Sequence, residues 1–264
     1  MNSLRWKREI AKFYSLLPVA KKSRKIILIY HAVGTGPWAI STDIFKQQIQ
    51  WLNENCKIVP ITKLLTERSQ ENKIQVALTF DDGYACLYDT VLPILNAVKA
   101  VGTVYLNTGW INQESRKTSC PDLGHYPGEQ FLTWNEVVAL DEAGWEIGSH
   151  GVEHIDLTIQ SSEVIRKELH DSKKEIEKQL KKPCHYFAYT FGRHSKLVRD
   201  AVGEAHYHYA VAAHHQSLLK SDDKVALPRL NVELGYSMDD FQSLVKGKWD
   251  FMGSIHRIKR MVCA

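Results

Sequence analysis

The chain has 264 residues, of which 44% are hydrophobic and 24% are charged, and its formal net charge is +4. This composition is that of an ordinary globular protein and excludes a disordered or fibrous chain. The mild positive charge is not gathered into a basic arm, so we expect no nucleic acid partner. The five cysteines form no CxxC pair, which favours a reducing compartment or idle thiols over a disulfide framework.

The start of the chain differs from the rest. We predict an N-terminal basic amphipathic segment over residues 1–24 and a single domain over residues 25–264. From Trp6 to Leu17 basic and apolar residues alternate, which is typical of a helix that packs on the domain or, alternatively, contacts a membrane surface. We recognise no signal peptide and no apolar run near the ~20 residues that span a bilayer. We therefore expect a cytoplasmic or membrane-peripheral location.

Short apolar runs rich in β-branched residues recur along the chain and are typical of buried parallel strands. They lie at Lys25–Tyr30, Gln75–Phe80, Thr103–Leu106, Glu146–Ser149, Tyr186–Tyr189, Tyr209–Ala212 and Val225–Leu227.

Helical patterns occupy the intervals between these runs. The clearest pattern lies over Thr42–Leu52, and another over Glu163–Lys181. Asp89 is expected to cap a third helix, with Pro93 in its first turn, and a capping box of Thr133 and Glu136 is expected to begin a fourth. This alternation predicts a single α/β domain with a parallel sheet, either closed as a barrel or open and doubly wound.

The first site with chemical information is the motif TFDDGY at residues 79–84. It ends an apolar strand, and ligands of parallel α/β sheets bind at the carboxyl ends of the strands. Two adjacent carboxylates, Asp81 and Asp82, repel each other unless a cation lies between them or one is protonated. A capped turn explains an Asp-Gly pair equally well.

The second site is the motif GSHGVEH at residues 148–154, which ends another strand. Two histidines four residues apart, His150 and His154, can converge on one ion. Together with one aspartate they leave a coordination position open, as in a catalytic zinc-like site. The remaining carboxylate can then accept a proton from the attacking water, and the residues alone leave open which aspartate does so.

The motifs TFDDGY and SHGVEH, in this order, resemble those of the polysaccharide deacetylase family of carbohydrate esterases. The segments LIYH at residues 28–31, FAYTFG at 187–192 and LPRLNV at 227–232 are also similar to family segments. The resemblance implies a distorted (β/α) barrel of about seven parallel strands. It also implies removal of N- or O-acetyl groups from a polysaccharide or oligosaccharide.

By position, the resemblance makes Asp81 the general base and makes Asp82, His150 and His154 the metal ligands. It implies a divalent metal, Zn²⁺ first, with Co²⁺, Ni²⁺ or Mn²⁺ as alternatives, since Asp/His sites accept all of them. The metal would polarise the acetyl carbonyl and lower the pKa of water.

Further residues are assigned around this centre. Arg229 is expected either to pair with Asp81, as an arginine does in the family, or to form a surface salt bridge. The expected substrate-binding residues are Tyr84, Tyr189, Phe191 and Gly192, with a backbone N–H after the strand at Tyr189 to stabilise the oxyanion.

The chain departs from the family pattern at three places. Thr190 replaces a proline, Gly151 replaces the usual Ser or Thr between the histidines, and the late Leu-His segment that carries the general acid is not found. His31 ends the first strand and is our leading candidate for this acid, followed by His214 and His215. It can instead contact substrate or pack as a structural histidine.

Other residues are expected to have ordinary roles. His125, His206, His208, His214, His215 and His256 are expected at the surface, and Trp110 and Trp134 in the core rather than on a sugar ring.

Two functions other than glycan deacetylation stay open. One is an amidohydrolase of the same fold acting on a small C–N substrate. The other is a glycan-binding module that has lost turnover, which the intact ligands oppose and the missing acid supports. Metal content and acetate release distinguish the three.

Overall fold

The computed structural model describes residues 6–10, 23–68 and 73–253. Their strands form one sheet with the order β7-β6-β5-β4-β3-β1-β8, and β2 pairs with β3 beside this path. Every strand pair is parallel. The bounds are β1 Arg24–Tyr30, β2 Lys57–Ile58, β3 Ile74–Phe80, β4 Thr103–Leu106, β5 Glu146–Ser149, β6 Tyr186–Ala188, β7 Tyr209–Val211 and β8 Leu230–Asn231.

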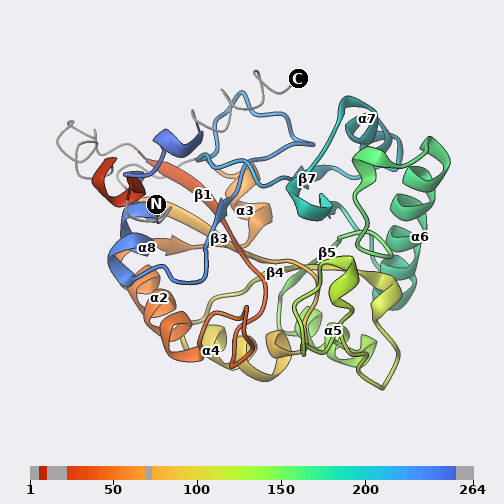
Figure 1. The fold of residues 1–264 in the computed structure, drawn as a ribbon, viewed down its shortest axis with the longest axis horizontal. Helices are drawn as coiled ribbons and strands as arrows, with labels where there is room; N and C mark the ends of the chain where they lie inside the picture. The colour runs from red at the N-terminus through yellow and green to blue at the C-terminus, as the bar shows by residue number, and fades with distance from the viewer. Residues whose placement is uncertain (1–5, 11–22, 69–72, 254–264) are drawn as a thin grey trace.

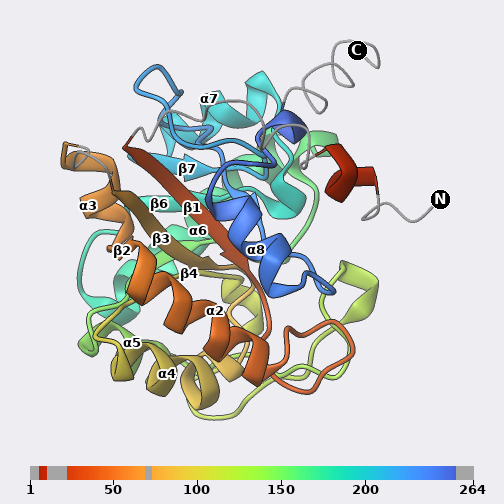
Figure 2. The ribbon, with the colours of Figure 1, turned by 90° about the vertical axis from the view of Figure 1, so that its left-hand side faces the viewer.

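The sheet is curled into a half-barrel, with helices on its outside (Figure 1). In the view turned by 90°, α2, α4 and α5 cover the outer face beside β1, β3 and β4 (Figure 2). The helices are α2 Thr42–Asn55, α3 Ile61–Thr66, α4 Leu92–Ala97, α5 Trp134–Glu142, α6 Ser162–Leu180, α7 Lys196–Glu204 and α8 Met238–Val245. The predicted single-domain, distorted barrel is therefore confirmed.

Alternate residues of the strands face two different cores. Ile26 and Leu28 of β1 and Val76 of β3 belong to the large cluster shared with the helices. Ile27 and Ala77, one position along, belong to the smaller cluster inside the curl. Because side chains of a strand alternate between its two faces, the residues that follow the strand ends can point into the mouth of the barrel.

The last predicted strand, Val225–Leu227, is wrong. Only Leu227 forms a bridge, with Val211 of β7, and the strand that pairs with β1 is β8, three residues later. The chain crosses from the edge of β7 to the edge of β1 over these residues, so it stays beside neither neighbour long enough to form a strand there.

The predicted helix signals hold in three of four cases. The capping box of Thr133 and Glu136 begins α5, and α2 and α6 lie where the apolar spacing predicts them. Asp89 is not a cap, because it lies inside a short π-helix, Leu87–Val91. Its carboxylate instead accepts two hydrogen bonds from Arg116, at 2.7 and 2.8 Å.

Residues 6–10 are helical and lie against the α8 side of the domain (Figure 1). The ring of Trp6 packs edge-on against Phe251, and Arg8 pairs with Asp240 at the start of α8. The rest of the predicted amphipathic helix lies outside the described residues. Among the described helices, none combines the length and the apolar character that crossing a membrane requires.

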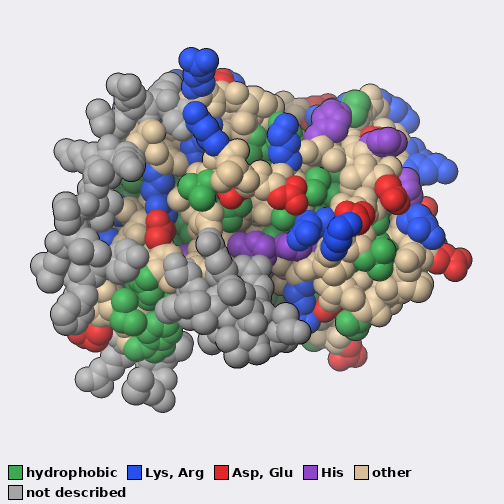
Figure 3. Space-filling model, turned by 90° about the horizontal axis from the view of Figure 1, so that it is seen from above, with side chains coloured by type: hydrophobic (Ala, Val, Ile, Leu, Met, Phe, Trp, Pro, Cys, Tyr) green, Lys and Arg blue, Asp and Glu red, His purple; other side chains and the backbone are tan. Residues whose placement is uncertain are grey.

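Charges of both signs are mixed on the face that Figure 3 shows. Basic side chains alternate there with acidic ones, and histidine side chains gather near the middle and toward one side. Charges of one sign therefore do not dominate the described part of this face.

Candidate metal centre

Asp82, His150 and His154 meet at the mouth of the barrel. Their ligand atoms all lie within 4.8 Å of one another, and all three residues are buried. Asp82 follows β3 and the histidines follow β5, which are separated by β4 alone. Since the carboxyl ends of parallel strands lie at the same edge of a sheet, these two loops converge.

The orientation of both rings suits a metal. Nδ1 of His150 lies 2.7 Å from the carbonyl oxygen of Ala188, and Nδ1 of His154 lies 2.6 Å from that of Leu123. Because a carbonyl only accepts, each Nδ1 carries the hydrogen, which leaves the Nε2 lone pairs facing Asp82 Oδ1 at 3.6 and 3.3 Å.

The protonation of the site fits the same conclusion. Burial lowers the pKa of His150, so its ring is neutral at neutral pH. Oδ1 of Asp82 is buried and has no hydrogen-bond partner among the described residues. A buried carboxylate oxygen without a partner is costly, and a divalent cation bound between it and the two Nε2 atoms would satisfy all three.

The backbone is strained at two of the three ligands. Asp82 has a φ of 71° and His154 a φ of 57°, in the left-handed region that few residues other than glycine adopt. Such conformations persist where the surrounding structure enforces them, and they cluster at functional sites. The geometry of the centre is therefore maintained by the fold at the expense of local backbone strain.

Glu168 of α6 supports the loop between the two histidines. Its Oε2 accepts the N–H groups of Val152 at 2.7 Å and Glu153 at 3.2 Å. Gly151 has a φ of +87°, and a Cβ there would lie 2.9 Å from the same oxygen. Glycine fits at this position, where the resemblance leads us to expect Ser or Thr, because the backbone is left-handed and the carboxylate is close.

Asp81 lies beside the centre and pairs with Arg229. Nη1 of Arg229 donates to Oδ1 at 2.7 Å and Nη2 to Oδ2 at 2.8 Å. Both side chains are buried, which decides between the predicted alternatives in favour of the pair with Asp81. Arg229 also donates to Ala212 O and Thr79 Oγ1, each at 3.2 Å, so its position is determined by β3 and the end of β7.

The charge of Arg229 controls the ionisation of Asp81. Burial alone would raise the pKa of this carboxyl group, but the guanidinium, helped by His150 and His31, lowers it to about 2. Asp81 is therefore a carboxylate throughout the neutral range, with a reduced affinity for a proton.

A pocket of about 200 Å³ opens onto these residues. His31, Phe191 and Gly192 line it together with the metal ligands, Asp81 and Arg229. Gly124 and Tyr126, from the loop at residues 112–130 between β4 and α5, line it as well. The ring of Phe191 is 47% exposed and packs on His154, with ring centroids 4.7 Å apart.

Tyr84 and Tyr189 do not line this pocket, although the sequence predicts both as substrate contacts. Both are fully buried. The Tyr84 hydroxyl accepts the N–H of Tyr126 at 2.7 Å, and the Tyr189 hydroxyl donates to Val225 O at 2.6 Å. The Tyr189 N–H donates to Val211 O at 3.1 Å. We therefore assign both tyrosines to the support of the pocket.

His125 was expected at the surface but is 2% exposed behind a metal ligand. Its ring centroid lies 4.8 Å from that of His154, and its Nδ1 accepts the N–H of Cys120 at 3.4 Å. Burial lowers the pKa of His125 to about 4, so an uncharged imidazole packs beside His154. Its polar, turn-rich surroundings in the sequence contain no signal for this burial.

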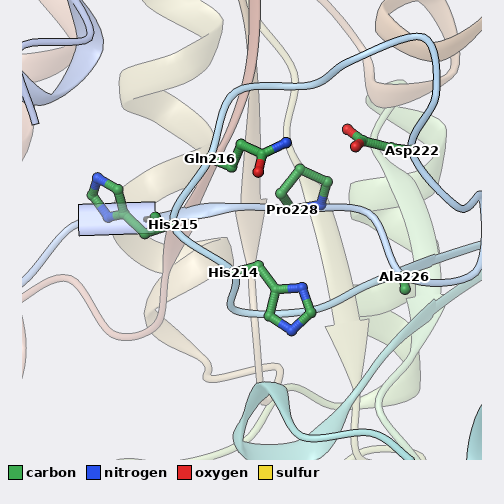
Figure 4. Close-up of a pocket in the computed structure, with 7 residues that line it drawn as sticks. His214, His215, Gln216, Asp222, Ala226 and Pro228 are labelled. Carbon is green, nitrogen blue, oxygen red and sulfur yellow. The ribbon is translucent and has the colours of Figure 1, made fainter. Parts of the chain in front are cut away.

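His214 and His215 lie at a second pocket of about 200 Å³ (Figure 4). The two rings point in different directions there, and neither residue lines the pocket of the metal centre. Nε2 of His214 lies 3.2 Å from Nε2 of His194. This arrangement makes His31 the better placed of the candidate acids.

Comparison with known families gives a direct match. A family model described as polysaccharide deacetylase matches residues 68–210, which include the aspartate and histidine motifs. The chain is 23% identical over 225 residues to a poly-β-1,6-N-acetyl-D-glucosamine N-deacetylase of Staphylococcus aureus (strain MRSA252). That match covers 81% of this chain and 72% of the relative.

Solved structures share the fold. A Streptococcus pyogenes deacetylase, PplD, in complex with acetate superposes with a TM-score of 0.71 at 23% identity, covering 85% of this chain and 99% of that one. A de-N-acetylase from Aggregatibacter actinomycetemcomitans superposes with a TM-score of 0.69 at 18% identity, covering 84% and 99%.

Proposed function

Because the chain belongs to the polysaccharide deacetylase family, a family of hydrolases, we propose that it removes N-acetyl groups from a glycan of acetylated amino sugars. The observation that carries the proposal is the ionised Asp81 beside three converging metal ligands. The activity named for the Staphylococcus aureus relative, N-deacetylation of an N-acetylglucosamine polymer, supports this choice of substrate.

Asp82, His150 and His154 would hold one divalent ion, zinc first, with cobalt, nickel or manganese as alternatives. When bound, the ion supplies a Lewis acid that polarises the acetyl carbonyl and lowers the pKa of water. The hydrogen bonds of His150 and His154 to backbone carbonyls keep both rings in the tautomer that binds it.

Asp81 acts as the general base in this proposal. Its carboxylate accepts a proton from the water that attacks the acetyl carbonyl carbon. Arg229 keeps the carboxylate ionised and oriented through two hydrogen bonds. The low pKa of Asp81 makes it a weak base, which fits a water whose own pKa a bound ion would lower.

The departing nitrogen needs a proton, because an amide anion is a very poor leaving group. His31 lines the pocket and is the proposed donor. The carbon–oxygen bond to water forms, the carbon–nitrogen bond breaks, and acetate and a free amino sugar leave. Phe191 and Gly192, which line the same pocket, would contact the substrate.

Acetate release from a β-1,6-linked N-acetylglucosamine oligomer, with and without chelator, tests the function. We expect release that the chelator abolishes and a divalent ion restores. Release from a small amide but from no oligomer would identify an amidohydrolase instead. Oligomer binding by a metal-loaded protein that releases no acetate would identify a binding module.

A further inference from the structure

A tryptophan stands exposed beside the pocket of the metal centre. Trp38, in the loop between β1 and α2, is 56% exposed, which is unusual for so large an apolar side chain. Trp110 and Trp134, the tryptophans weighed for sugar contact from the sequence, are half-buried and buried. The exposed indole is therefore the better candidate for contact with a ligand.

The loop that carries Trp38 is held by backbone hydrogen bonds. Gly34 N donates to Ile40 O at 2.9 Å and Ile40 N to Ala32 O at 3.0 Å, which ties both ends of the loop to the end of β1. Ala39 N donates to Gly36 O at 3.1 Å, closing a turn around the tryptophan. The indole is thus presented from an anchored loop, so little ordering would be needed on binding.

Trp38 connects to the pocket through Tyr126. The ring centroids of Trp38 and Tyr126 lie 6.5 Å apart. Tyr126 lines the pocket and stacks on His31, with centroids 5.3 Å apart and an interplanar angle of 25°. Its backbone N–H is held by the Tyr84 hydroxyl. A row of rings therefore leads from the proposed acid to the exposed indole without interruption.

We propose that Trp38 and Tyr126 form a stacking subsite for the sugar ring next to the one that is deacetylated. The proposal rests on the proposed function, because the occupant is a second ring of the same glycan. The apolar C–H face of a pyranose packs on an aromatic face, and the hydroxyl groups at its edge remain in water. A single acetylated sugar at the metal centre would lie in the pocket that Tyr126 lines and would leave the indole of Trp38 uncovered, so Trp38 would favour oligomers.

Steady-state kinetics of Trp38→Ala and Trp38→Phe test the subsite. The substrates are N-acetylglucosamine, its β-1,6-linked tetramer and 4-nitrophenyl acetate. For Trp38→Ala we expect kcat/KM on the tetramer to fall about tenfold, as for loss of one ring-stacking contact, with the other two substrates unchanged. Trp38→Phe should retain most of the activity on the tetramer, because a stacking face remains.

Leu219→Ala is the matched control. Leu219 is 55% exposed, almost as much as Trp38. Its neighbour Leu218 donates its N–H to Lys25 O, near the start of β1. Leu219 therefore lies at the end of the barrel opposite to the metal centre, which is at the carboxyl ends of the strands. This variant removes a similar exposed apolar group and should leave all three substrates unaffected.

Two kinetic results would overturn the subsite: an unchanged rate of Trp38→Ala on the tetramer, or an equal loss on all three substrates. If the wild type releases no acetate, the proposed function fails, and equilibrium binding of the tetramer then decides the subsite. Binding about tenfold weaker in Trp38→Ala would support it, whereas equal binding, or no binding by the wild type, would reject it.

Discussion

Arg229 and Asp81 form a buried, two-bond ion pair across the mouth of the barrel, although 148 residues separate them in the chain. The segment that carries Arg229 crosses from β7 to β1, and its side chain bonds Thr79 and Asp81 at the end of β3. The same ion pair therefore holds the segment before β8 in place and keeps the proposed base, Asp81, ionised. The folding of the last strand and the ionisation of Asp81 are consequently linked.

Removing Arg229 should destabilise the protein and change its pH dependence. Arg229→Met leaves Asp81 buried without its partner, so we expect a loss of roughly 3–5 kcal/mol at neutral pH. In the wild type the pKa of Asp81 is lowered from 3.8 to about 2, so its stabilising contribution is complete above pH ~4 and is lost as the pH falls toward 2. Urea unfolding of both proteins in chelator, between pH 2 and 7, measures the free energy of unfolding at each pH. Identical pH profiles for the two proteins would contradict the claim that Arg229 lowers the pKa of Asp81.

The metal ligands should be separable from the other histidines. Purified protein should carry about one divalent ion per chain, and His150→Ala or His154→Ala should lose it, since two remaining ligands bind weakly. His170→Ala, on the exposed side of α6, is the control and should retain the ion. Elemental analysis after dialysis gives the occupancy, and full occupancy in the double variant His150→Ala/His154→Ala would remove the site from consideration.

The two adjacent aspartates should behave differently. Asp81→Asn should abolish turnover with metal still bound, because it removes a base and no ligand. Asp82→Asn should weaken metal binding itself. Metal titration and acetate release on the same preparations distinguish the two roles, and the reverse result would exchange them.

Glu168 should affect metal affinity without touching the metal. Glu168→Ala removes the acceptor of two N–H groups between His150 and His154, so we expect metal affinity to fall by roughly 10–100-fold. Glu168→Gln keeps an acceptor oxygen and should recover part of the loss. Glu163→Ala, an exposed acid on the same helix, is the control, and an unchanged metal Kd in Glu168→Ala would refute this positioning role.

His31 should matter most when the leaving group is an amine. His31→Ala should lower kcat on an amide by roughly 10²–10⁴-fold with metal retained. Acetyl esters should suffer less, because an alkoxide leaves more readily than an amide nitrogen. Near wild-type amide turnover in this variant would mean that another group donates the proton.

The sequence by itself predicted most strands of the sheet and the three residues that converge at the candidate metal centre. Strands such as β1 and β3 are buried along most of their length and consist mainly of apolar residues, which local composition reveals. Asp82 comes shortly after β3, and His150 and His154 come shortly after β5. The meeting of the ligands therefore required only the rule that parallel strands end at one edge.

Other features of the site were decided by tertiary contacts between distant segments. The burial of His125 behind His154 depends on how the loop at residues 112–130 folds over the barrel mouth. The inward position of Arg229 depends on the path of the chain between β7 and β1, and the exposure of Trp38 on the closure of its loop at β1. The local spacing of residues does not indicate whether these side chains are buried or exposed, because the environment of each is formed by residues far away in the sequence.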